Sequence, residues 1–217
     1  MHFRKLTVTL IFLVFSLFLG VRSMGNPIDS IPTSAQYLSQ YVQIQSVTGS
    51  EKEAGIYLSG LASEMGLHIQ IFTEEVDSYN FAASLYPLSS GKPNIVFLTH
   101  IDVVDAQEDH NNHYPPFSGT IAENCVWGRG TLDNKGMGIM QLMAISKYVE
   151  LAKNSDLPYN ITLLAVSSEE TGGEKGAKII IERFLDLLNP VVVYGEGGSG
   201  FDGLLTKEPH KHVYGIC

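Results

Sequence analysis

This sequence of 217 residues is poor in cysteine and in positive charge. Its two cysteines, Cys125 and Cys217, lie far apart, so no disulfide framework is indicated. Lysine and arginine together number 14, against 23 aspartates and glutamates, which gives a formal net charge of -9. A chain of this charge repels nucleic acid and anionic membrane surfaces, so we expect neither as a partner.

The sequence also lacks internal repeats, low-complexity tracts and an obvious linker, and only its N-terminus stands apart. Two basic residues in the first five precede an apolar run from Leu6 to Val21, which ends at Val21-Arg22-Ser23. This pattern predicts a signal peptide over residues 1–23, with a secreted or periplasmic domain over residues 24–217 and no stable membrane insertion after cleavage. An uncleaved anchor is the alternative, although a comfortable span needs ~20 apolar residues.

The remaining residues alternate between helical and extended patterns. With 44% hydrophobic residues, the chain can build one sizeable core. We expect the first helix to be capped by Ser30 or Thr33 and the second to end at Gly66. The alternation predicts an α/β three-layer sandwich around a mostly parallel sheet. The expected helices cover residues 31–41, 51–65, 136–152 and 174–188, and the expected strands cover 69–72, 81–86, 95–99, 161–167 and 191–194.

Polar side chains follow three of the predicted strands. His100 and Asp102 follow the strand at 95–99, Glu169 and Glu170 follow the strand at 161–167, and Glu196 follows the strand at 191–194. Because ligands collect beyond the carboxyl ends of parallel strands, we expect these side chains to share one rim. One imidazole with several carboxylates is a ligand set that suits zinc.

A glycine-rich stretch, Gly128 to Gly136, leads into the long predicted helix and carries Asp133. It invites comparison with a phosphate-binding loop, but Lys135 precedes its glycine and the Gly-Lys-Ser/Thr order is absent. Each segment also has a plainer interpretation, such as a hydrogen-bonded His-Asp pair or a charged loop. The functional interpretation is favoured because four such segments occur in order, each after a strand or before a helix.

Three of these blocks resemble a known family. They are His100-Ile101-Asp102-Val103-Val104, Gly128-Arg129-Gly130-Thr131-Leu132-Asp133-Asn134-Lys135-Gly136 and Ser168-Glu169-Glu170-Thr171-Gly172-Gly173. They are similar to the signature blocks of the co-catalytic zinc peptidases, which include aminoacylase, carboxypeptidase S and succinyl-diaminopimelate desuccinylase. The resemblance implies a zinc-exopeptidase-like domain that hydrolyses amide bonds in peptides or N-acyl amino acids, with two zinc ions.

The resemblance also implies a role for each residue. His100 would bind one zinc ion, Asp133 would bridge both, Glu170 would bind the other, and Glu169 would be the general base. Related enzymes differ at the third ligand of the His100 ion. Glycine stands here at the position where some relatives carry aspartate, so Glu196 is assigned as that ligand, with a solvent-facing Glu196 as the alternative.

Asp102 lies two residues after His100 on an extended segment, so its side chain points to the same side of the chain. Its carboxylate is suited to accepting the free imidazole N–H and fixing the tautomer of the ring. We therefore predict a supporting role for Asp102 rather than a ligand role.

Members of the resembled family are about twice as long, with a lid or dimerisation domain and one further zinc-binding histidine. We therefore expect this chain to stop before the site is complete, with only Asp133 and Glu170 at the second ion. His210 and His212 are interpreted as surface residues. A homodimer is left open for the full-length protein, and the alternative function is an inactive fragment that keeps a partial metal site.

Overall fold

The fold is seen in a computed structural model that describes residues 31–106, 113–197, 199–201 and 213–215. By its internal contacts the chain divides into Met1–Ile31 and Pro32–Cys217, and every element below belongs to the second unit. The predicted signal peptide over 1–23 lies outside the described residues. Among the residues that are described, no helix is long and apolar enough to cross a membrane.

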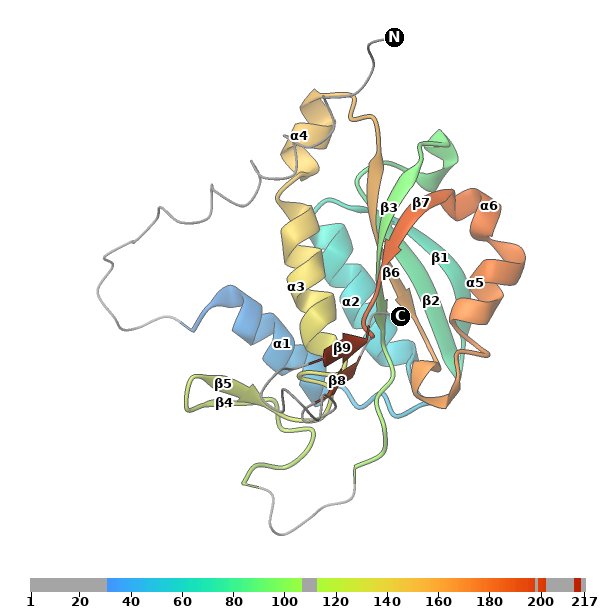
Figure 1. The fold of residues 1–217 in the computed structure, drawn as a ribbon. Helices are drawn as coiled ribbons and strands as arrows, with labels where there is room; N and C mark the ends of the chain where they lie inside the picture. The colour runs from blue at the N-terminus through green and yellow to red at the C-terminus, as the bar shows by residue number, and fades with distance from the viewer. Residues whose placement is uncertain (1–30, 107–112, 198, 202–212, 216–217) are drawn as a thin grey trace. The chain divides into compact units, whose positions relative to one another are not determined.

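Helices and strands alternate along the chain as predicted (Figure 1). The helices are α1 (Thr33–Gln43), α2 (Lys52–Glu64), α3 (Lys135–Ser146), α4 (Val149–Asn154), α5 (Ala177–Arg183) and α6 (Leu185–Leu188), with short 3₁₀ turns η2 (Leu88–Ser90) and η3 (Glu169–Thr171). The strands are β1 (His68–Glu75), β2 (Ser78–Ser84), β3 (Asn94–His100), β4 (Thr120–Ala122), β5 (Cys125–Trp127), β6 (Asn160–Val166), β7 (Pro190–Tyr194), β8 (Ser199–Phe201) and β9 (Val213–Gly215).

Five strands form the central sheet in the order β1-β2-β6-β3-β7. β3 pairs in parallel with both β6 and β7, whereas β2 is antiparallel to both β1 and β6. Four of the five strands therefore run in one direction and only β2 is reversed. The mostly parallel sheet predicted from the sequence is confirmed, and its carboxyl ends meet at one edge.

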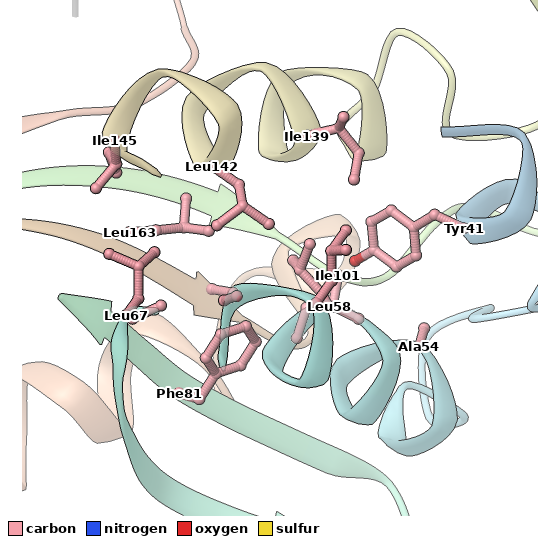
Figure 2. Packing of buried hydrophobic residues seen from close by; sticks show 14 of the residues in the cluster. Tyr41, Ala54, Leu58, Leu67, Phe81, Ile101, Ile139, Leu142, Ile145 and Leu163 are labelled. Carbon is pink, nitrogen blue, oxygen red and sulfur yellow. The ribbon is translucent and has the colours of Figure 1, made fainter. Parts of the chain in front are cut away.

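Helices cover both faces of this sheet, which makes three layers (Figure 1). Alternate residues of β6 point to opposite faces: Leu163 and Ala165 join a core with α2 and α3, whereas Leu164 and Val166 join a second core with α5 and α6. Figure 2 shows the first core, in which α2, α3 and the sheet residues interdigitate. This burial on both faces explains why the second half of β6, Leu163 to Val166, is an uninterrupted apolar run.

Two of the predicted long helices are broken in the structure. The helix expected over 136–152 divides into α3 and α4, because the Tyr148 N–H bonds the Ile145 carbonyl three residues back and the Ser146 hydroxyl bonds the carbonyl of Met143. The helix expected over 174–188 begins only at Ala177 and divides into α5 and α6 at Phe184, whose φ is -130°. Gly176, directly before α5, has φ -121° and ψ -108°, which are not helical angles.

The expected cap of the first helix was wrong. Pro32 is the N-cap residue of α1, and its carbonyl accepts the N–H groups of Ala35 and Gln36 at 2.9 and 3.1 Å. Thr33 is instead the first residue of the helix, and Ser30 lies outside the described residues. Proline suits this place because its fixed φ matches the entry of the chain into a helix.

Two short hairpins were not predicted. β4 pairs with β5, and β8 pairs with β9, both antiparallel. Each of these strands has three residues, which is too short for a two-residue hydrophobic alternation to stand out in the sequence.

Candidate metal centre

Three neighbouring strands end at the same edge of the sheet and carry the candidate site there. His100 is the last residue of β3 and is paired with Val166, the last residue of β6. β7 runs parallel to β3 on its other side. The segments that follow β6 and β7 therefore emerge beside His100, and they bring Glu169, Glu170 and Glu196 to it.

The His100 ring lies at the centre of a group of carboxylates. Its Nε2 atom is 2.8 Å from Asp133 Oδ1, 2.9 Å from Glu196 Oε1 and 3.8 Å from Glu169 Oε2. His100 itself is 2% exposed, whereas the side chain of Asp133 is 65% exposed. The site is thus buried on the imidazole side and open on the carboxylate side, as an entry path for a cation and a substrate requires.

The donor atoms match what a cation such as zinc needs. Two sets of three residues each offer ligand atoms within 4.8 Å of one another, namely His100, Asp133 and Glu196, and His100, Glu169 and Glu170. Zinc binds imidazole nitrogen and carboxylate oxygen at about 2.0–2.2 Å, so tetrahedral ligand atoms need to separate by only about half an ångström from the observed 2.8 and 2.9 Å. The residues therefore fit the metal that the sequence pattern predicts.

Acidic neighbours hold a proton on His100 when no cation is bound. Burial favours the neutral ring, but contact with Asp102 and the charges of Glu196 and Asp133 outweigh it and raise the pKa of His100 to about 9. A metal ion at Nε2 must displace this proton. Cation binding at this acid cluster is therefore coupled to the release of a proton from His100.

Asp102 contacts His100 through its backbone as well as through its carboxylate. The His100 Nδ1 atom is 2.9 Å from the Asp102 carbonyl oxygen and 3.5 Å from its carboxylate, so the backbone is the nearer partner. The carboxylate is taken up by other donors: the Thr48 hydroxyl at 2.8 Å and the N–H groups of Glu169 and Glu170 at 3.0 and 3.1 Å. Burial raises the pKa of Asp102, but hydrogen bonding outweighs this effect and the pKa is lowered.

Glu169 and Glu170 lie on η3, the turn that follows β6. The Glu169 side chain is half exposed, with its Oε2 atom 3.8 Å from His100. Partial burial raises the pKa of Glu169, with Glu196, Asp102 and Asp133 adding to the increase and His100 opposing it. Burial also raises the pKa of Glu170, with Asp133 as the largest of the charges that contribute. A carboxyl group with a raised pKa is a stronger base than an ordinary one.

Asn134 is a site residue to which sequence reasoning gave no role. Its side-chain amide donates to the Glu196 carboxylate, and its oxygen accepts the Thr99 hydroxyl. These bonds tie the loop after β7 to β3 and turn Glu196 toward His100 rather than toward solvent. In the sequence, only its position next to Asp133 in the glycine-rich block could have marked Asn134 as a site residue. The peptide bond between Asp133 and Asn134 is cis.

The glycine-rich stretch packs too closely to serve as a phosphate cradle. Lys135 is fully buried, and its Nζ atom donates to the carbonyls of Tyr41 and Ile44 at 2.9 and 2.6 Å. A side-chain carbon on Gly136 would lie 2.0 Å from the Thr131 carbonyl oxygen. The lysine therefore fastens α3 to the end of α1 and is not available to bind a phosphate.

All six residues predicted for the site lie at this edge of the sheet. They are His100, Asp102, Asp133, Glu169, Glu170 and Glu196. His210 and His212, interpreted from the sequence as surface residues, lie outside the described residues.

Comparison with known proteins agrees with the motifs. The profile of Peptidase family M20/M25/M40 matches residues 96–216. A probable succinyl-diaminopimelate desuccinylase of Staphylococcus aureus (strain MRSA252) is 34% identical over 167 residues, which cover 76% of this chain and 39% of that protein. The chain thus spans about two fifths of the length of that relative.

Solved structures share the fold. An M20 family metallo-carboxypeptidase from Sulfolobus solfataricus matches 79% of this chain and 38% of its own, with a TM-score of 0.64 and 24% identity. A Bacillus subtilis protein described as a dinuclear metal-binding peptidase of the M20 family matches 75% of this chain and 42% of its own, with a TM-score of 0.55 and 14% identity. At these identities the likeness concerns the fold.

Proposed function

Because the chain belongs to Peptidase family M20/M25/M40, we propose that its candidate centre serves metal-dependent hydrolysis of an amide bond. The observation that supports this most directly is the position of the His100 Nε2 atom, 2.8 and 2.9 Å from carboxylate oxygens of Asp133 and Glu196. The chain spans 39% of the S. aureus desuccinylase, so the activity is proposed for the protein as a whole. Peptides or N-acyl amino acids are the proposed substrates.

We propose that two cations, zinc by preference, share Asp133. His100 and Glu196 would complete the first set, and Glu170 would belong to the second. By this assignment, Asp133 and Glu170 are the only ligands of the second ion among the described residues, one fewer than the three protein ligands that a catalytic zinc normally has. When bound, such cations polarise the scissile carbonyl and acidify the attacking water.

The residues of the chain then have distinct tasks. Glu169, half exposed and with a raised pKa, accepts the proton of the attacking water and passes it to the leaving nitrogen. Asp102 fixes the turn that carries Glu169 through the two backbone N–H groups that it accepts. A pocket of about 110 Å³ borders His100, Glu169 and Glu196. Its other lining residues include Leu98, Val166 and Ala177, which provide an apolar wall beside the scissile bond.

Export is a separate proposal. We propose a secreted or periplasmic location for the protein because residues 1–23 have the pattern of a signal peptide. Mass spectrometry of the N-terminus of protein recovered from its native host tests it. A mature chain that begins near residue 24 would support export, and an intact Met1 in the cell interior would contradict it.

Metal content and turnover test the function together. Purified protein should bind zinc, and the activity of metal-loaded protein on dipeptides and N-acyl amino acids should disappear with a chelator. Asp133→Ala should lose most of the metal, whereas Glu169→Gln should keep the metal and lose turnover by about 10²–10⁴-fold, the usual contribution of a general base. Glu174→Gln is the matched control, because this exposed carboxylate pairs with Lys178.

The two variants separate the parts of the proposal. Loss of metal in Glu169→Gln would contradict its role as base. Zinc binding without hydrolysis of any amide substrate, in a protein of the relatives' full length, would contradict the proposed activity.

A further inference from the structure

Arg129 is a cation that the proposed chemistry does not use. Its Nε atom is buried and has no hydrogen-bond partner among the described residues. Its Nη2 atom lies 3.5 Å from the Asp105 carbonyl oxygen, which is the outer limit of a hydrogen bond. No carboxylate in the part of the chain that the structure describes forms an ion pair with Arg129. Most of the N–H donors of this guanidinium group therefore have no protein partner there.

The cavity at Arg129 reaches the candidate metal centre. It has a volume of about 260 Å³, and its wall includes Arg129 together with Asp133 and Glu170, two of the proposed metal ligands. Of the described residues that line this cavity, only Arg129 is positively charged. A second cavity of about 220 Å³, which Tyr114 and Trp127 help to line, also borders Arg129. The arginine thus lies between the reacting centre and an aromatic pocket.

The loop that carries Arg129 is held in place by close packing. The Arg129 N–H donates to the Pro116 carbonyl at 2.6 Å. Gly130, the next residue, has φ +85°, and a side-chain carbon there would lie 2.8 Å from a methyl carbon of Val103. Because the backbone is fixed before a ligand arrives, little entropy is lost when the guanidinium group binds one.

The chemistry of the cavity indicates what Arg129 binds. A buried N–H without a partner costs stability, and a ligand that accepts its hydrogen bond removes this cost. The planar guanidinium group matches the two oxygens of a carboxylate. The acids of the metal centre would repel an anionic substrate, and a cation in the same cavity offsets that repulsion. Peptides and N-acyl amino acids, the proposed substrates, carry such a carboxylate close to the scissile amide.

We propose that Arg129 binds a carboxylate group of the substrate while the scissile amide lies at the metal centre. The hydrolase then selects substrates with a negative charge close to the scissile bond. Two parts of such a substrate supply a carboxylate, namely the leaving amino acid and an acidic acyl group. The effect on turnover rests on the proposed function, whereas the binding of a carboxylate at Arg129 does not.

Matched substrate pairs test the proposal on zinc-loaded protein. N-acetylmethionine and N-acetylmethioninamide differ in the carboxylate of the amino acid, and N-succinylmethioninamide and N-butyrylmethioninamide differ in that of the acyl group. Wild type is compared with Arg129→Gln and Arg129→Lys. Arg183→Gln is the matched control, because Arg183 is exposed at the end of α5. Release of the acyl group gives kcat/KM, and the ratio within each pair is the quantity of interest.

Wild type should prefer the charged member of at least one pair. Arg129→Gln should lower that preference about 10- to 100-fold, the range for a hydrogen bond to a charged group. Arg129→Lys keeps the charge without the planar fork, so its ratio should lie between those of wild type and Arg129→Gln. Arg183→Gln should keep the wild-type ratio. The pair that responds identifies the source of the carboxylate.

Binding is measured separately from turnover. Trp127 is the single tryptophan of the chain and lines the second cavity beside Arg129, so its fluorescence should report on ligands bound there. Zinc-loaded protein is titrated with methionine and with succinate, the charged products of the two pairs. Arg129→Gln should raise the Kd of at least one of them about tenfold or more, whereas Arg183→Gln should leave both unchanged.

Other outcomes overturn the proposal. An unchanged ratio in both pairs for Arg129→Gln would show that Arg129 does not contact a carboxylate. An equal loss of activity on charged and neutral substrates would make Arg129 a structural residue of the loop. If melting shows that Arg129→Gln does not fold, Arg129→Lys decides, and a wild-type ratio and wild-type product Kd would refute the proposal. If wild type hydrolyses none of the four substrates, the proposed function fails, and the product titrations still decide whether Arg129 binds a carboxylate.

Discussion

The proton on His100 should make the metal-free protein sensitive to mild alkali. The folded pKa of about 9 lies above the ordinary value of 6.5, so the protonated ring contributes stability that is fully present below pH 6.5 and is lost as the pH rises through about 9. At ~1.4 kcal/mol for each pH unit, the difference amounts to roughly 3 kcal/mol. The 2% exposure of the ring means that solvent screens this contribution little.

A second buried group acts in the opposite direction over the same range. Burial lowers the pKa of Lys135 to about 7, below its ordinary 10.5, so its contribution to stability rises between about pH 7 and 10.5. The pH dependence of wild-type stability therefore combines both contributions and does not isolate that of His100. The informative quantity is the difference in unfolding free energy between wild type and His100→Gln, in which the Lys135 contribution cancels.

Urea unfolding of chelated protein at pH 6.5, 7.5, 8.5 and 9.5 measures this difference. From pH 6.5 to pH 9.5, the free energy of unfolding of wild type should fall by roughly 3 kcal/mol relative to that of His100→Gln. Zinc affinity should rise about tenfold with each pH unit below 9, because the cation displaces one proton from the ring. A difference between the two proteins that stays constant with pH would refute the assignment of the proton to His100.

Two further predictions concern the glycine-rich stretch and its helix. Lys135→Met should lower the free energy of unfolding in urea at pH 7 by roughly 2 kcal/mol, because two carbonyls at the end of α1 lose their donor. An unchanged unfolding midpoint would show that the two bonds contribute no net stability. Gly136→Ala should lower the free energy of unfolding by at least about 2 kcal/mol, because the added carbon meets a backbone oxygen at 2.0 Å. Gly60→Ala in α2, where the added carbon has nothing within 4 Å, should raise it by roughly 0.5–1 kcal/mol. Equal effects at the two glycines would contradict the close packing of the stretch.

Local patterns were sufficient to predict most of the sheet and the composition of the site. β3, β6 and β7 are apolar runs that end in polar residues, and a parallel sheet brings such ends together whatever the details of packing. His100, Glu169 and Glu196 were therefore predictable as neighbours. The breaks in the two long helices were not predictable, because they depend on a hydroxyl bonding back to a carbonyl and on non-helical backbone angles at Gly176 and Phe184 that the sequence pattern does not report.

The sequence by itself determined which atoms could meet a cation: one imidazole and a set of carboxylates at the ends of adjacent strands. Only the tertiary structure decided how those atoms are held. The Asp102 carboxylate accepts N–H groups of the turn after β6, and the side-chain amide of Asn134 holds Glu196 beside His100. Hydrogen bonds between distant segments leave no periodicity in a sequence, so their partners appear only when the chain is folded.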